Sequence, residues 1–435
     1  MSDNTYTTDT LSTVNNLMDQ FVPEDDEARH KLVRQLVMEP LNTIEDVPFT
    51  KQEIQDILGK FDPRKAPGKD ALNSEILMHT FKIFPATFSE IYECLRRGHF
   101  PKQWKISVLI PLIKPGKEEL NEAQKYRPIS LLNVGGKVLE KLLIDRINYH
   151  LYSNSLINNQ FGFCPQKSTI DAALAVKQFA QYHLQQRNYV VMISLDVLGA
   201  FDATWYPSIL NNLRNLRCPS NLYNLTRTYF SDRVATWHAN TYRMERKVSR
   251  GCPQGSCCGP AFWNVMYDAL LNLEYSTHSK IIAFADDLVI LTYGTTQYEA
   301  EAYANCDLAR IEIWARENKM QFNDSKSKAM LITRKRRQDD INILLNNRRL
   351  AQVTEIKYLA IHFDSKLKFN SHIDHIAEKS RKLVYMLSKT AKLNWGLGHK
   401  ALKTIRRSNG PTDDLRVPSL GRGCFKNWQP DQTAE

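Results

Sequence analysis

The sequence predicts an α+β protein, because strand patterns and helix patterns are mixed along the chain without regular strand–helix–strand alternation. Apolar runs rich in Ile, Val and Leu indicate buried strands within residues 189–197 and 280–293. Apolar residues at helical spacing indicate helices elsewhere, for example over residues 169–185. The 435 residues contain no repeated strand–helix–strand order of the Rossmann type. A hydrophobic content of 43% supports a sizeable core, in two or three domains or in one multi-lobed enzyme.

The N-terminal region predicts little regular structure. Residues 1–45 are polar and acid-rich, which favours a loosely ordered leader with one short helix near residues 30–38. Regular structure is expected to begin at Thr50, which has capping-box spacing to Glu53 ahead of an amphipathic helix. Prolines and a glycine in residues 62–70 end that helix.

The later elements follow from the same two periodicities. Helical spacing predicts further helices over residues 136–152, 169–185 and 297–318 and from Pro207 onward. Apolar runs predict strands over residues 104–113, 189–197, 280–284, 288–293, 328–333 and 356–363, with a loop over residues 114–130.

Charge and cysteine content narrow the class of protein. Lysine and arginine number 58 against 47 aspartate and glutamate residues, a net charge of +11 that favours a polyanionic partner. The eight cysteines show neither paired CxxC spacing nor a zinc-type Cys/His cluster, so we expect a reduced, intracellular protein of the nucleus, the cytoplasm or both. The sequence shows no signal peptide and no uninterrupted apolar run of about 18 residues, so neither secretion nor membrane spanning is expected.

The stretch FADD places Asp286 and Asp287 side by side within the apolar run 280–293. A tight turn is the simpler explanation, because aspartate accepts turn geometry. Here, however, the turn would project both acids from a buried hairpin, where carboxylates about 4 Å apart repel by roughly 4 kcal/mol at an effective dielectric constant near 20. They would protonate or bind a cation, and Mg²⁺ suits one or two carboxylates completed by water and phosphate oxygens.

Asp196 supplies a third acid where the strand pattern 189–197 ends, just before Gly199 permits a change of direction. If this strand pairs beside the FADD hairpin, Asp196 and Asp286 would share one face and could bridge two Mg²⁺ ions. Such a pair activates an attacking hydroxyl and stabilises a leaving phosphate in an in-line displacement. By itself Asp196 fits a helix cap or a turn equally well. The nearby Asp202 is the competing acid, which we expect to be structural.

Eight blocks extend this pattern along residues 45–390: RKAPGKD, YRPISLL, QFGF, SLDVLGAFDATWYP, SRGCPQGSCCGPAFWN, FADD, MQFNDSKSKAMLIT and IKYLAIHFD. In this order they resemble the motifs of reverse transcriptases of non-LTR (LINE-type) retrotransposons. The resemblance is to the jockey-like elements of arthropods and their rDNA-inserting relatives. It implies an RNA-directed DNA polymerase that adds dNTPs to the 3′-hydroxyl of a DNA primer on an RNA template, with two Mg²⁺ ions as cofactors and Mn²⁺ as a substitute.

The resemblance also implies a right-hand polymerase with fingers, a palm built on an antiparallel sheet, and a partial thumb. The expected division is a polar leader (1–45), fingers with the start of the palm (46–190), the palm with the catalytic motifs (191–365), a partial thumb (366–405) and an unrelated tail (406–435).

Four residues of this chain match catalytic positions of the family, and Phe201 matches a nucleotide-binding position. Asp196, Asp286 and Asp287 match the metal-binding acids. Phe201 matches an aromatic ring that lies against the sugar C2′ and excludes a 2′-hydroxyl, although core packing is the ordinary role of Phe. Lys326 matches a lysine that protonates the leaving pyrophosphate, although a solvated lysine is the default.

Four further residues match positions that contact the incoming nucleotide. The planar guanidinium of Arg127 would grip the triphosphate bidentately. Lys114 would make a second phosphate contact. Gln254 matches a residue near the dNTP, and Gly255 belongs to a glycine-rich turn that would let the backbone approach a nucleotide.

Three features depart from the family pattern. Cys164 stands where arginine is common, Ala360 replaces a glycine in the hairpin IKYLAIHFD, and the resemblance ends near Ile405. A truncated thumb is therefore expected, as in a fragment or derivative of a retrotransposon polyprotein. Two alternatives stay open: a catalytically impaired nucleic-acid-binding protein that retains the polymerase fold, and an unstable pseudogene product whose exposed apolar surface favours aggregation.

Overall fold

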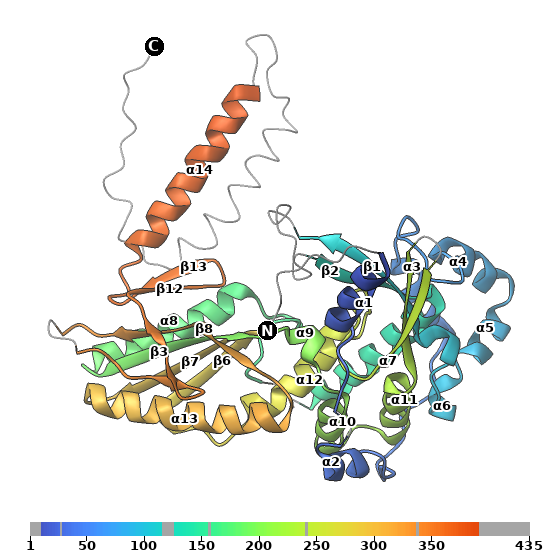
Figure 1. The fold of residues 1–435 in the computed structure, drawn as a ribbon, viewed down its shortest axis with the longest axis horizontal. Helices are drawn as coiled ribbons and strands as arrows, with labels where there is room; N and C mark the ends of the chain where they lie inside the picture. The colour runs from blue at the N-terminus through green and yellow to red at the C-terminus, as the bar shows by residue number, and fades with distance from the viewer. Residues whose placement is uncertain are drawn as a thin grey trace. The chain divides into compact units, whose positions relative to one another are not determined.

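The computed structural model describes residues 10–26, 28–114, 126–154, 158–239, 242–335 and 339–390. These residues form helices and sheets with mainly antiparallel strands, which confirms the α+β class (Figure 1). Two compact units are each assembled from separate stretches. The first contains Met1–Phe163, Val197–Leu273 and Ile311–Phe322, and the second contains Cys164–Asp196, Glu274–Arg310 and Asn323–Glu435. The boundaries of leader, fingers, palm, thumb and tail stay predictions, and residues 391–435 lie outside the described residues.

The first unit contains a four-stranded sheet in the order β2–β1–β4–β5. The strands are β1 (Ile106–Ile113), β2 (Tyr126–Leu131), β4 (Arg233–Ala239) and β5 (Tyr242–Val248). β2 corrects the loop expected over residues 114–130. Proline is uncommon inside sheets, because it cannot donate a hydrogen bond to a neighbouring strand. In the structure Pro128 lies opposite Pro111 on β1, where neither residue can donate a backbone hydrogen bond to the other.

Most helices of the first unit follow residue 50. They are α3 (Lys51–Lys60), α4 (Ser74–Ile83), α5 (Pro85–Ile91), α6 (Cys94–Arg97), the 3₁₀ turn η1 (Lys102–Lys105), α7 (Val134–Ser153), α9 (Ala200–Ala203), α10 (Tyr206–Asn215), α11 (Ser220–Phe230) and α12 (Gly259–Leu271). The predicted capping box at the start of α3 is confirmed, since Thr50 and Glu53 exchange side-chain and backbone hydrogen bonds.

The N-terminal segment is more ordered than the sequence suggested. Helices α1 (Thr10–Phe21) and α2 (Lys31–Leu36) occupy it, and only α2 was expected. Val14, Met18 and Val22 of this segment pack with sheet residues that include Trp237. The expectation of a loosely ordered leader is therefore wrong for the described part. Its polar composition concealed one apolar face at helical spacing.

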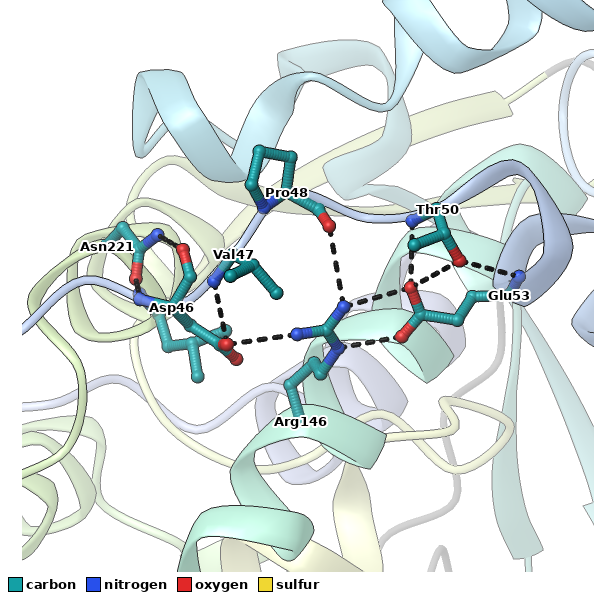
Figure 2. A network of polar contacts seen from close by, with 8 residues as sticks. Asp46, Val47, Pro48, Thr50, Glu53, Arg146 and Asn221 are labelled. Atoms are coloured by element: carbon teal, nitrogen blue, oxygen red, sulfur yellow. Dashed lines mark hydrogen bonds and ion pairs between the residues drawn. The ribbon is translucent and has the colours of Figure 1, made fainter.

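An arginine network also ties the N-terminal segment to α7 (Figure 2). The guanidinium of Arg146 donates to both carboxylate oxygens of Glu53, at 2.7 and 2.9 Å, and to Asp46 Oδ1 at 2.9 Å. Asn221 on α11 holds the backbone of Asp46 through two hydrogen bonds of 2.9 and 2.7 Å. One side chain thus joins the start of α3, the segment before it and α7.

The second unit contains a five-stranded sheet in the order β11–β8–β3–β7–β6. Its strands are β3 (Tyr189–Val197), β6 (Ser279–Phe284), β7 (Asp287–Gly294), β8 (Phe322–Ile332) and β11 (Ala351–Gln352), and the helices that cover it are α8 (Thr169–Gln185) and α13 (Gln297–Glu317). His183 of α8 stacks on Tyr293 with ring centroids 3.6 Å apart, whereas Thr292 donates to the Ala300 carbonyl of α13 at 3.0 Å. Because successive strand residues point to opposite faces, both faces of the sheet are covered. This explains the continuous apolar runs.

The second unit ends in small hairpins and one long helix. These elements are β9 (Leu344–Leu345), β10 (Arg348–Arg349), β12 (Glu355–Tyr358), β13 (Ile361–Asp364) and α14 (Asn370–Thr390). The single strand expected over residues 356–363 is therefore a hairpin, in agreement with the family resemblance of IKYLAIHFD. Among the described residues, no helix combines the length and the apolar character needed to cross a bilayer.

The turn of the β12–β13 hairpin is strained. Leu359 and Ala360 have φ of +48° and +65°, a left-handed conformation that suits glycine. We expect Ala360→Gly to raise the free energy of unfolding by about 0.5–1 kcal/mol, after allowance for the larger entropy of the unfolded glycine chain. Urea unfolding measures the change. The control is Ala302→Gly in helix α13, which we expect to cost about 1 kcal/mol; a similar loss at position 360 would contradict the strain.

Candidate active site

Three carboxylates gather at one end of the sheet in the second unit. The antiparallel register of β3 and β7 pairs Leu195 with Leu288. Asp196 is the next residue of β3, so it lies beside Asp287, the first residue of β7. Asp286 immediately precedes Asp287 in the turn from β6. The strand pairing on which the sequence prediction depended is therefore present.

The FADD turn has the tight geometry that the sequence predicted. Phe284 pairs with Asp287, so Ala285 and Asp286 form a two-residue loop between β6 and β7. Ala285 adopts φ +56°, which is unfavourable for a residue with a Cβ. Backbone strain of this kind persists where the surrounding structure fixes the chain, and the strands on either side are buried. The turn therefore holds the two acids in a defined orientation.

The electrostatics of this site favour a proton or a cation. Desolvation raises the pKa of Asp287, and the negative charges of Asp286 and Asp196 raise it further. Residue 287 nevertheless keeps an exposed surface, so a hydrated ion can reach it. Carboxylate oxygens are the ligands that Mg²⁺ prefers, so the donor set fits this metal. In the described part of the chain no group of three His, Cys, Asp or Glu side chains is already arranged around one metal position.

Two neighbours on β8 contact Asp196. Lys326 Nζ lies 3.9 Å from Asp196 Oδ2, and both side chains are accessible to solvent. The Asp196 N–H donates to Ser327 Oγ at 3.1 Å, and this buried hydroxyl donates in turn to the Asn323 carbonyl at 2.7 Å. Sequence reasoning identified Lys326 and missed Ser327. The alternation of side chains along a strand was the signal that could have separated the two residues, because it directs Lys326 and Ser327 to opposite sides of β8.

Tyr358 of β12 is a second residue that sequence reasoning missed. Its side chain is buried, and burial together with the charge of Asp287 raises its pKa. Its hydroxyl has no hydrogen-bond partner among the described residues. The hairpin IKYLAIHFD thus brings an aromatic side chain close to the carboxylates of the second unit.

The predicted nucleotide-contact residues lie in the first unit. Arg127 is exposed on β2. The Ser130 N–H of the same strand donates to the Gln254 carbonyl at 2.7 Å. Burial raises the pKa of Asp202. A side-chain hydrogen bond with Gln254 and the positive charge of Lys114 act in the opposite direction and lower this pKa. Asp202, expected to be merely structural, therefore contacts one predicted nucleotide residue and lies near another.

Phe201 and Gly255 have clear local environments. The Phe201 ring is partly exposed and packs against Phe163 and Trp263, with centroids 6.2 and 5.8 Å apart. Gly255 has φ +125°, and a Cβ there would lie 2.5 Å from the Ser130 carbonyl oxygen. Close packing on β2 thus already requires glycine at position 255. The roles of these residues, and of the acids and Lys326, in nucleotide chemistry stay predictions.

Comparison with known proteins identifies the family of this chain. The model of the reverse transcriptase (RNA-dependent DNA polymerase) family matches residues 114–363. The RNA-directed DNA polymerase from the mobile element jockey of Drosophila funebris is 30% identical over 363 residues, which are 80% of this chain and 38% of that protein. The Pol polyprotein of the R1 retrotransposable element of Bradysia coprophila is 28% identical over 402 residues, which are 92% of this chain and 39% of that protein.

The chain spans about two fifths of the length of these relatives. The family match itself covers more than half of the 435 residues, from Lys114, directly after β1, to Phe363 in β13. This chain belongs to the reverse transcriptase (RNA-dependent DNA polymerase) family, and its relatives are polymerases of non-LTR retrotransposons such as R1 and jockey.

Proposed function

We propose that this chain is an RNA-directed DNA polymerase that extends a DNA primer on an RNA template. The observation that carries the proposal is the pairing of β3 with β7, at whose end Asp196, Asp286 and Asp287 lie close enough to raise the pKa of Asp287. The net charge of +11 supports a nucleic-acid partner, because lysine and arginine neutralise backbone phosphates. The intracellular location inferred from the cysteines belongs to the same proposal.

In the proposed reaction the primer 3′-hydroxyl attacks the α-phosphorus of a dNTP, the bond to the bridging oxygen breaks, and pyrophosphate leaves. Asp196, Asp286 and Asp287 would hold two Mg²⁺ ions, for which Mn²⁺ is the expected substitute. Bound ions of this kind activate the attacking hydroxyl and neutralise charge on the leaving phosphate. Lys326 is close to Asp196 and would donate a proton to the pyrophosphate.

Five further residues would bind and select the nucleotide. Arg127 presents an exposed guanidinium, which suits bidentate contact with the triphosphate. Lys114 would add a second positive charge. Gln254 and Gly255 would form the surface beside the dNTP, and the partly exposed Phe201 ring would exclude a 2′-hydroxyl.

Primer extension on an RNA template tests the proposal. Purified residues 1–435 with Mg²⁺ should incorporate dNTPs, and Asp286→Ala should not. Asp340→Ala is the control, because Asp340 is a highly exposed acid of the same unit and should be dispensable. Salt-sensitive template binding without incorporation would favour the catalytically impaired binding protein instead. Aggregated material that neither binds nor incorporates would favour the pseudogene product.

A substitution at Phe201 tests nucleotide selection separately. We expect Phe201→Val to raise the relative kcat/KM for rNTPs over dNTPs about tenfold, because a smaller side chain leaves room for the 2′-hydroxyl. Steady-state incorporation of matched dNTPs and rNTPs measures this ratio. Phe163→Val, which removes the neighbouring ring, is the control. An unchanged ratio in Phe201→Val would leave Phe201 with a packing role alone.

A further inference from the structure

A buried carboxylate on α7 holds the Gln254 loop, which is the segment of residues 249–258 between β5 and α12. Glu140 is 2% exposed, and its carboxylate accepts three hydrogen bonds. Tyr229 Oη donates at 2.9 Å, Ser256 Oγ at 3.0 Å and the Cys257 N–H at 2.8 Å. A carboxylate removed from water is unfavourable unless such donors replace its hydration. Because two of the three donors belong to the loop, movement of the loop away from α7 would leave the buried carboxylate with the Tyr229 hydroxyl as its one remaining donor among these three.

The rest of the loop is attached to other predicted nucleotide-contact elements. Before Gln254, the Cys252 N–H donates to the Phe201 carbonyl at 2.8 Å. Gln254 itself accepts from the Ser130 N–H of β2 at 2.7 Å. The segment after Gln254 is the part that reaches Glu140. The loop is therefore held on both sides of Gln254, and Glu140 accepts hydrogen bonds from the part that follows Gln254.

A positively charged side chain, Arg233, is also buried near the Glu140 carboxylate. Arg233 is 1% exposed, and its guanidinium lies 4.3 Å from the centroid of the Tyr229 ring. Its Nη1 donates to the Tyr229 carbonyl at 3.5 Å. Tyr229 thus contacts both Glu140 and Arg233. The positive charge of Arg233 compensates the negative charge of the Glu140 carboxylate in the interior. The three side chains are buried, as a positioning role requires.

We propose that Glu140 is a positioning residue that fixes the Gln254 loop on β2, the strand of Arg127, and thereby sets the affinity for the incoming dNTP. The inference rests on the proposed polymerase function. Glu140 itself would not touch the nucleotide, since its carboxylate is buried and fully engaged. Removal of the acceptor should therefore weaken dNTP binding more than it slows the chemical step.

Two substitutions at position 140 test this role by steady-state kinetics. We expect Glu140→Leu to raise the dNTP KM about tenfold while kcat stays within about twofold, since it leaves the loop donors without an acceptor. Glu140→Gln should recover most of the loss, because its amide oxygen can still accept from the loop. Ser256→Ala should give a smaller rise and serves if the leucine variant does not fold. Asp145→Asn is the control, because it removes an exposed carboxylate from the same helix.

A second measurement needs no polymerase activity. Burial raises the pKa of the Cys257 thiol to about 12, and the charge of Glu140 contributes to this rise. Loss of the Glu140 charge should lower this pKa, so alkylation of Cys257 should become faster in Glu140→Leu and stay unchanged in Asp145→Asn. Mass spectrometry of the peptide that contains Cys257 measures the rate. An unchanged dNTP KM in Glu140→Leu, or an unchanged alkylation rate, would overturn the positioning role. If the parent chain incorporates no nucleotide, the proposed function fails, whereas an unchanged alkylation rate would separately contradict the contact between Glu140 and the loop.

Discussion

Asp287→Asn should abolish nucleotide incorporation and at the same time make the folded protein more stable. Loss of one of three acids that would hold the metal should lower kcat by at least about 10³-fold. The same change removes repulsion from Asp286 and Asp196, so the free energy of unfolding should rise by about 0.5–1 kcal/mol after allowance for solvent screening. Primer extension and urea unfolding without divalent ions measure the two effects.

The pH dependence of stability gives Asp287→Asn a distinct signature. The folded-state pKa of Asp287 is raised, so between its ordinary value and the raised value the folded protein binds more protons than the unfolded chain. The stability of the parent should therefore fall as pH rises through this window, and the asparagine variant should lack this component. Mg²⁺ should restore stability to the parent alone.

The control for Asp287→Asn is Asp340→Asn, an exposed acid of the same unit. It should retain both activity and ordinary stability. A variant at position 287 that stays active, or that loses stability in the absence of metal, would contradict the crowding of carboxylates on which the active-site assignment depends.

Arg146→Ala should lower the free energy of unfolding by about 2–3 kcal/mol, somewhat less than a fully buried ion pair because both acids keep some solvent contact. The substitution leaves Glu53 and Asp46 without their shared guanidinium (Figure 2). Arg146→Lys should recover only part of the loss, because an ammonium cannot make the same forked contact. Lys141→Ala, which removes an exposed ion pair of the same helix, should cost less than about 0.5 kcal/mol.

Acid unfolding checks the same network. Partial burial raises the pKa of Glu53, but hydrogen bonds from Arg146 and Thr50 outweigh it and lower the pKa to about 2. This contribution to stability is present above the ordinary value of 4.5 and is lost as the pH falls from 4.5 towards 2. Arg146→Ala should show a shallower loss over this interval than the parent. Equal slopes would show that the guanidinium does not hold the Glu53 carboxylate.

Much of the fold could be predicted because it depends on local patterns. The helix over residues 169–185 and the strand over residues 189–197 were predicted with their observed bounds, since apolar periodicity is a property of neighbouring residues. Helix α1 was missed because its few apolar residues are diluted by polar ones, and β2 because Pro128 obscured the strand. Both elements are stabilised by distant partners, such as Trp237 for α1 and β1 for β2.

The sequence by itself determined the family, the acids Asp196, Asp286 and Asp287 as candidates, and the turn between two buried strands. Only the tertiary structure decided that β3 pairs with β7 in the register that sets Asp196 beside Asp287. It alone also revealed Ser327, Tyr358 and the buried carboxylate of Glu140. The physical reason is that charge repulsion, burial and hydrogen bonding act between atoms close in space, whereas periodicity reports only on residues close along the chain.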